Sequence, residues 1–386
     1  MTASERQPTS APSAAHQWWT LQVFYHQADK DHLIVHGATP VLERLQAQHH
    51  IERSFLQRHW HHGPHLRINV LLSPEAAADE VRQALVNGLQ PYLQAHPSVT
   101  QLDEAEYIRR YAPVAGYELL DQPLLPLYGS GELRWSPLLM RDHRYGSPRI
   151  AHLSRELLSD LQPMVTTLLA SRPTAEGRLL QFAGWMFTFA GAFQECMDDM
   201  FGSVPSVALS FRSHAEGYYH NVPEGDTVRC RFEQTARVNR AALARELELA
   251  LDTAGPYTIL RTHLARAAAQ GLTLHARNEL YVFGRKDYEI ADQQLAPGIP
   301  RPTGSYSPRH ATLADPDSDL SRLLQEPEIQ IRRWLVNLLY DRMMTAGCRP
   351  VERFALCELV ASTVEAVHGP DSFLYPAPRP LKVTAV

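Results

Sequence analysis

A histidine-rich run that ends in alternating polar residues has the densest potential chemistry in the sequence. It reads His59-Trp60-His61-His62-Gly63-Pro64-His65-Leu66-Arg67-Ile68-Asn69. Successive side chains of a β-strand point to opposite faces, so His65, Arg67 and Asn69 would share one face. An imidazole, a guanidinium and a carboxamide could line a pocket that holds an anion or an amide oxygen. The solvated face of an antiparallel sheet has the same pattern, and the sequence leaves both interpretations open.

The pattern of these histidines does not favour a metal site. His59, His61 and His65 have the same strand parity, but Gly63-Pro64 predicts a turn between them. No carboxylate or cysteine lies within the run to complete a coordination shell. The sequence also has no P-loop and no GxGxxG motif. We therefore expect neither a metal ion nor another cofactor.

A second run, Phe211 to His220, brings together four side chains that can transfer protons. They are a hydroxyl, an imidazole, a carboxylate and a phenol, from Ser213, His214, Glu216 and Tyr219. Such density suits catalysis in which a general acid and a general base reach one substrate. Ser213 and Glu216 also fit the S-x-x-E capping box of a helix start, and both interpretations can hold together. No G-x-S-x-G motif supports a serine hydrolase.

Two further segments offer candidate substrate contacts. Arg144 and Tyr145 lie in a charged turn that could contact an anionic group, although a surface ion-pair cluster is the more usual explanation. Tyr306 lies in a proline-flanked loop, Gly304 to His310, that could be a lid or a linker.

Strands early in the chain and helices after them must position these residues. Trp18 to His26 alternates and predicts a strand, and Glu52 to Leu72 predicts a hairpin that turns at His62-Gly63-Pro64. Helical spacing predicts helices over 32–47, 73–94, 153–169, 175–200, 239–254, 257–270, 318–325, 328–346 and 351–368. Ser73 should cap the second of these. Residues 97–150 read as loop-rich, and residues 206–228 as short extended and turn segments. The pattern indicates an α+β fold with mixed antiparallel sheet(s), flanking helices and a helix-rich C-terminal half.

Composition narrows the function classes. The 386 residues are 44% hydrophobic and 20% charged, as in an ordinary soluble domain. The net charge of −5 argues against a nucleic-acid binder, and no apolar run is long enough to predict a membrane span. Residues 1–15 predict a disordered tail rather than a signal peptide, so we expect a cytoplasmic protein. We expect one catalytic domain over 16–370, an irregular tail over 371–386, and buried free thiols at Cys348 and Cys357.

The first run carries a resemblance to a known family. Phe55-Leu56-x-Arg58-His59-Trp60-x-x-Gly63-Pro64-His65-Leu66-Arg67 resembles the motif of the C-terminal, elimination-type domain of lantibiotic dehydratases, which has stand-alone thiopeptide relatives. The Trp19 strand, the Arg144-Tyr145-Gly146 turn and the Arg333 to Met344 helix fall in the family's order. The resemblance implies an enzyme that modifies a ribosomally made peptide.

Two positions depart from the family pattern. The family has His-x-Arg-x-Arg and a histidine on the late helix, and its arginines hold the carboxylates of a leaving glutamate. Here Arg67 is kept, Asn69 replaces the second arginine, and Asn337 stands at the late position. Asparagine neither exchanges a proton near neutral pH nor offers a cationic fork. The departures suggest that the scaffold is kept and the reaction has changed.

Stand-alone relatives with such departures resemble thiopeptide pyridine synthases, whose pattern is similar to Ser213-His214-x-Glu216. These enzymes join two dehydroalanines by a formal [4+2] aza-cycloaddition, closing a macrocycle, with loss of water and of the leader peptide. The resemblance then implies these catalytic residues: His65, Arg67, Ser213, His214, Glu216 and Tyr219. It implies these substrate contacts: Trp60, Asn69, Arg144, Tyr145, Arg212 and Tyr306.

The implied partner is a precursor peptide with its leader, with transient contacts to other pathway enzymes and with neither nucleic acid nor membrane. Two alternatives remain open. One is an enzyme that eliminates glutamate from glutamylated Ser or Thr. The other is a non-catalytic protein that binds the leader peptide.

Overall fold

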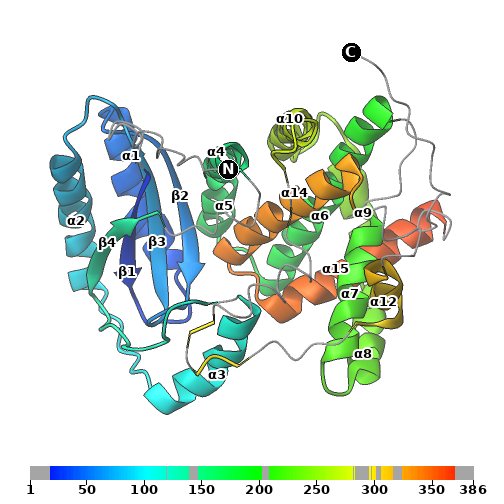
Figure 1. The fold of residues 1–386 in the computed structure, drawn as a ribbon, viewed down its shortest axis with the longest axis horizontal. Helices are drawn as coiled ribbons and strands as arrows, with labels where there is room; N and C mark the ends of the chain where they lie inside the picture. Colours follow the sequence, from blue (N-terminus) through cyan, green and yellow to red (C-terminus); the bar gives the residue numbers. More distant parts are fainter. Residues whose placement is uncertain are drawn as a thin grey trace, which may run out of the picture. The chain divides into compact units, whose positions relative to one another are not determined.

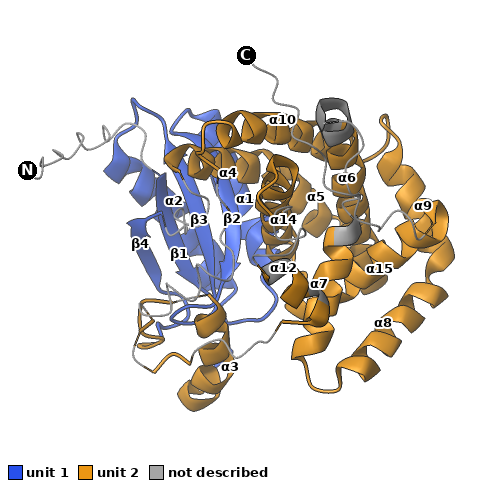
Figure 2. Ribbon diagram, turned by 45° about the vertical axis from the view of Figure 1, so that its right-hand side comes forward, with its two compact units in different colours: residues 1–102, 127–140 blue, residues 103–126, 141–386 orange. Residues whose placement is uncertain are grey.

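The computed structural model describes residues 18–118, 120–138, 147–201, 208–280, 282, 295–296, 298–300, 306–315 and 324–369. The predicted contacts Arg144 and Tyr145 and most of the predicted helix over 318–325 lie outside these residues. The chain divides into two compact units, one of residues 1–102 and 127–140 and the other of residues 103–126 and 141–386 (Figure 2).

Unit 1 is built on a four-stranded antiparallel sheet in the order β2-β3-β1-β4. The strands are β1 (Trp18–Phe24), β2 (Ile51–His59), β3 (His65–Leu72) and β4 (Leu133–Pro137). The predicted first strand and the predicted hairpin are both confirmed. In the hairpin turn the backbone N–H of Gly63 donates to Trp60 O at 2.9 Å, and Gly63 has a φ of 118° that favours glycine.

Helices cover one face of this sheet (Figure 1). They are the π-helix η2 (Leu33–Ala38), α1 (Thr39–Ala47) and α2 (Ala78–Ala95). Arg82 of α2 lies over the ring of Trp19, 3.8 Å from its centroid. The strand pairing places Leu21, Leu56 and Ile68 on the same face of the sheet as Trp19, and all three are fully buried. This apolar face is the core of unit 1.

Two helix starts differ from the predictions for unit 1. The single helix predicted over 32–47 is a π-helix followed by an α-helix, with Pro40 near the N-terminus of α1. The predicted N-cap at Ser73 is wrong, because α2 begins at Ala78. Ser73 instead starts a turn in which its carbonyl accepts the N–H of Ala76 at 3.0 Å.

Unit 2 is helical in its described part. Its helices are α3 (Glu104–Tyr117), α4 (Pro148–Asp160), α5 (Gln162–Ala170), α6 (Ala175–Phe201), α7 (Ala208–Asn221), α8 (Gly225–Val238), α9 (Arg240–Leu251), α10 (Thr258–His275), α12 (Pro308–Ala314), α14 (Pro327–Thr345) and α15 (Pro350–His368). α6 packs against α9, α10, α14 and α15, and its large side chains such as Trp185 and Phe187 are buried. The predicted α+β class is confirmed. None of the helices in the described ranges combines the length and the apolar character needed to cross a lipid bilayer.

The region 206–228 is the main error in the predicted secondary structure. It holds all of α7 and the start of α8, which pack on each other and on α15 (Figure 1). Ser213 lies inside α7, so the predicted capping box with Glu216 is wrong. α3 was also not predicted within the loop-rich stretch; Asp103 caps it by accepting the N–H of Glu106 at 2.7 Å. Cys348 and the α15 residue Cys357 are buried free thiols, as predicted.

Candidate active site

The polar face of β3 in unit 1 carries three of the predicted residues. Cross-strand partners in an antiparallel sheet share a face, and Asn69 pairs with Thr20 and Phe55. Arg67 likewise pairs with Gln22 and Gln57. This face is buried as well as polar: His65 is fully buried and Arg67 is only 8% exposed.

His65 is a neutral imidazole that orients Arg67. Its Nδ1 lies 2.9 Å from the carbonyl oxygen of Gly63, which can only accept a hydrogen bond, so Nδ1 carries the proton. Nε2 therefore accepts the Nε–H of Arg67 at 3.3 Å. Burial, and next the charge of Arg67, hold the pKa of His65 well below its usual value. The imidazole thus positions a guanidinium and does not compete with it as a cation.

Asn69 already has partners for all of its hydrogen-bonding groups. Its Oδ1 accepts the hydroxyl of Thr20 at 2.7 Å, and its Nδ2 donates to Phe55 O at 3.3 Å and to Gln57 Oε1 at 3.2 Å. The side chain therefore ties β1, β2 and β3 together. These bonds hold Asn69 within the sheet, and its predicted contact with substrate stays a prediction.

The stability of the protein is expected to fall as the pH is lowered below about 6.5, in part because of His65. The pKa of this residue in the folded state lies well below the unfolded value of 6.5, so below that pH the unfolded chain binds a proton that the folded chain does not. Urea unfolding between pH 7.5 and 5 measures this slope. The variant His65→Gln should be less stable at pH 7.5 but have a flatter slope; an unchanged slope would contradict the neutral buried imidazole.

In unit 2, α7 directs two of the predicted residues to one carboxylate on α15. Arg212 Nη1 donates to both oxygens of Glu358, at 2.5 and 2.6 Å, and the Tyr219 hydroxyl donates to Glu358 Oε2 at 3.0 Å. Arg212 Nη2 reaches Ser362 and Glu365, at 3.1 and 3.0 Å. Glu358 is 1% exposed. These contacts connect Arg212 and Tyr219 of α7 to α15, and the predicted substrate contact and proton transfer stay predictions.

His214 is held by a hydrogen bond to α14. Its Nδ1 lies 2.8 Å from the hydroxyl of Tyr340, which also lies 3.3 Å from the Cys357 sulfur. An imidazole nitrogen is a better hydrogen-bond acceptor than a thiol sulfur, so the Tyr340 hydroxyl donates to Nδ1. The proton of the neutral imidazole is then bonded to Nε2. Burial, and next the charge of Arg353, lower the pKa of His214 to about 3. His214 is thus a neutral N–H donor at physiological pH.

The Nε2 atom of His214 has no hydrogen-bond partner among the described residues. A donor that is held in place and has no protein partner is available for a further hydrogen bond.

Ser213 contacts a histidine that sequence reasoning did not select. Its Oγ lies 3.0 Å from Nε2 of His310 on α12, and Nδ1 of His310 lies 2.6 Å from Oγ of Ser307. Ser307 is the N-cap of α12 and accepts the N–H of His310 at 3.3 Å. The Ser307-Pro308 helix start was the available signal, because it fixes the residue three positions on. Among the described residues, Ser213 and His214 thus each have a supporting group from another helix.

The remaining predicted residues have less defined roles. Glu216 and Tyr306 are half-buried, and Trp60 stacks on His59 with ring centroids 5.7 Å apart. Asn337 is exposed on α14. In the ranges that the structure describes, no group of three His, Cys, Asp or Glu side chains is arranged to hold a metal ion.

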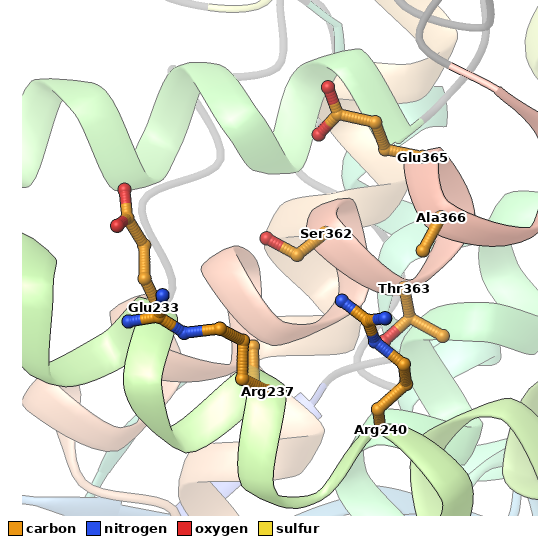
Figure 3. A pocket seen from close by; sticks show the side chains of 8 residues that line it. Glu233, Arg237, Arg240, Ser362, Thr363, Glu365 and Ala366 are labelled. Carbon is orange, nitrogen blue, oxygen red and sulfur yellow. The ribbon is translucent and has the colours of Figure 1, made fainter.

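A pocket of about 290 Å³ lies between α8, the start of α9 and α15 (Figure 3). It is lined by Glu233, Ala236, Arg237, Arg240, Ser362, Thr363, Glu365 and Ala366. Guanidinium and carboxylate groups both line it, and two of its residues, Ser362 and Glu365, contact Arg212. None of the residues predicted for catalysis lines it.

Comparisons with known proteins agree with the fold. Pyridine synthase TbtD from thiomuracin biosynthesis has a TM-score of 0.69 at 21% identity, over 92% of this chain and 99% of that chain. The crystal structure of TsrL has a TM-score of 0.63 at 15% identity, over 92% of this chain and 97% of that chain. No curated protein matches the sequence. The family model described as lantibiotic biosynthesis dehydratase C-term matches residues 18–364, and the chain belongs to that family.

Proposed function

We propose that this protein forms the central pyridine, or a dehydropiperidine, of a thiopeptide. The reaction joins two dehydroalanines of a precursor peptide by a formal [4+2] cycloaddition and loses water, which gives the dehydropiperidine; release of the leader peptide as its carboxamide then gives the pyridine. Membership of the family and a fold similar to that of a pyridine synthase support the proposal. The observation that carries it is the pair of neutral, oriented groups at Ser213 and His214.

The reaction needs a donor more than it needs a strong base. One amide must pass its N–H proton to its own oxygen and become an iminol, whose C=N and the adjoining alkene form the four-atom partner. The second alkene then forms two carbon–carbon bonds with it, and the hydroxyl leaves as water. A hydrogen-bond donor fixed beside that oxygen stabilises the charge that develops there, and the Nε2–H of His214 is such a donor.

Positioning supplies the other requirement. Holding two distant alkenes in near-attack geometry removes much of the entropic cost of joining them. Arg67, steadied by the neutral His65, can bind a peptide carbonyl or carboxylate without an imidazolium beside it.

Elimination of glutamate is the alternative with a concrete chemical requirement. It needs cationic groups for the leaving carboxylates, and Arg67 lacks a second arginine on its face at position 69. The side chain of Asn69 forms hydrogen bonds to the two strands beside its own, and Arg212 is paired with Glu358. A non-catalytic leader-binding role would give the oriented Nε2–H of His214 no function.

One experiment separates the three functions. The full-length protein is incubated with a leader peptide that carries two dehydroalanines, and separately with a glutamylated peptide, and the masses are followed. A cyclised core and a released leader amide support pyridine formation. Loss of glutamate from the second peptide would replace this proposal with elimination, and binding without a mass change would leave a partner protein.

A further inference from the structure

The contact between α7 and α12 orients the hydroxyl group of Ser213. Serine and threonine inside a helix often donate to the carbonyl four residues back, as Ser154 does to Ile150 at 2.7 Å and Thr188 does to Gly184 at 2.8 Å. Ser213 instead meets His310 Nε2 from another helix. Its hydroxyl is therefore held by tertiary structure rather than by its own helix.

The protonation of His310 follows from Ser307. Ser307 is 5% exposed, and its hydroxyl proton has His310 Nδ1 as the acceptor that the described residues provide. A buried hydroxyl without an acceptor is costly, so Nδ1 accepts and the imidazole proton lies on Nε2. Nε2–H then donates to Ser213 Oγ. The hydroxyl proton of Ser213 must point away from His310.

We propose that Ser307 and His310 are positioning residues that hold Ser213 as a hydrogen-bond donor toward the substrate. This inference rests on the proposed function, in which a substrate oxygen gains charge and later leaves as water. Ser213 and His214 are then two neutral donors on neighbouring residues of α7, each oriented by a group from another helix: His310 for the hydroxyl, Tyr340 for the imidazole.

Gly217 provides a way to displace His310 without removing it. A Cβ added at Gly217 would meet His310 Cε1 at 3.2 Å, which is close enough to push the ring by a few tenths of an ångström. Gly217 lies within α7, where alanine is otherwise the better helix former. The variant Gly217→Ala should therefore be at least as stable as the wild type and yet less active. Gly177→Ala is the matched control, because its Cβ would meet Thr174 Oγ1 at 3.3 Å, away from the Ser213–His310 pair.

Steady-state kinetics of the full-length protein with the bis-dehydroalanine peptide test the positioning role. His310→Phe removes the donor and should lower kcat by about 10- to 100-fold with KM within about twofold. His310→Gln keeps an N–H near the Nε2 position and should recover most of the loss. Gly217→Ala should lower kcat severalfold, and Gly177→Ala should not. A His310→Phe variant with wild-type kcat, or a His310→Gln variant as impaired as His310→Phe, would overturn the inference.

A spectroscopic measurement separates this inference from the proposed function. Nitrogen NMR of protein labelled at histidine, with His310→Gln used to assign the signal, should show a protonated Nε2 and an unprotonated Nδ1. The variant Ser307→Ala should weaken that preference. A ring protonated on Nδ1 would sink the inference even if the peptide is cyclised. The expected ring without turnover of any peptide would overturn the proposed function and leave the orientation of Ser213 standing.

Discussion

The variant His214→Ala is expected to lower kcat for pyridine formation by about 100- to 1,000-fold, the usual cost of losing one oriented donor to a developing charge. His214 is held by Tyr340 at 2.8 Å and stays neutral because burial lowers its pKa to about 3. Its removal takes away the N–H and leaves the substrate contacts elsewhere intact. KM should therefore change much less than kcat.

Two further variants make this prediction specific. Tyr340→Phe keeps the imidazole and removes the hydroxyl that fixes it, so an intermediate loss of about tenfold is expected. His220→Ala changes an exposed histidine near the C-terminal end of the same helix and should leave kcat unchanged. Equal losses in His214→Ala and His220→Ala would indicate damage to α7 rather than loss of a donor.

Glu358→Leu is expected to lower the free energy of unfolding by about 3 kcal/mol, because the partly buried guanidinium of Arg212 loses its buried carboxylate and keeps only the half-exposed Glu365. Glu358 accepts hydrogen bonds from Arg212, Tyr219 and Ser362, and its side chain is 1% exposed while that of Arg212 is 18% exposed. Chemical denaturation followed by circular dichroism measures the loss.

The matched control is Glu365→Gln. Glu365 also pairs with Arg212, at 3.0 Å, but its side chain is 41% exposed, so its loss should cost less than about 1 kcal/mol. The double variant Arg212→Met with Glu358→Leu should recover part of the loss, since it removes both charges. If Glu358→Leu and Glu365→Gln lower the free energy of unfolding by the same amount, the burial of Glu358 does not explain its contribution to stability.

The sequence predicted the secondary-structure elements that depend on residues close together in the chain. The hairpin was predicted over Glu52 to Leu72, and the structure has it over 51–72, because alternation and Gly63-Pro64 act within a few residues. α7 was missed because Ser213, His214 and Gly217 are poor helix formers, and its packing against α8 and α15 stabilises it instead.

The composition of the site depends on contacts far apart in the chain. Ser213 and His310 are 97 residues apart, and Arg212 and Glu358 are 146 apart. A single sequence shows which side chains could do chemistry but not which of them find a buried partner. Asn69 illustrates this: its side-chain type suggested a departure from the family pattern, but the sequence did not show that its side chain bonds across three strands.

The masses of the products formed from a leader peptide with two dehydroalanines test the central claim most directly. Cycloaddition followed by aromatisation conserves every atom, so the cyclised core, one water and the leader carboxamide must together equal the mass of the substrate. We predict both peptide products with the wild-type protein and far slower release of both with His214→Ala. An unchanged substrate, or loss of glutamate from a glutamylated peptide in its place, would contradict the proposed function.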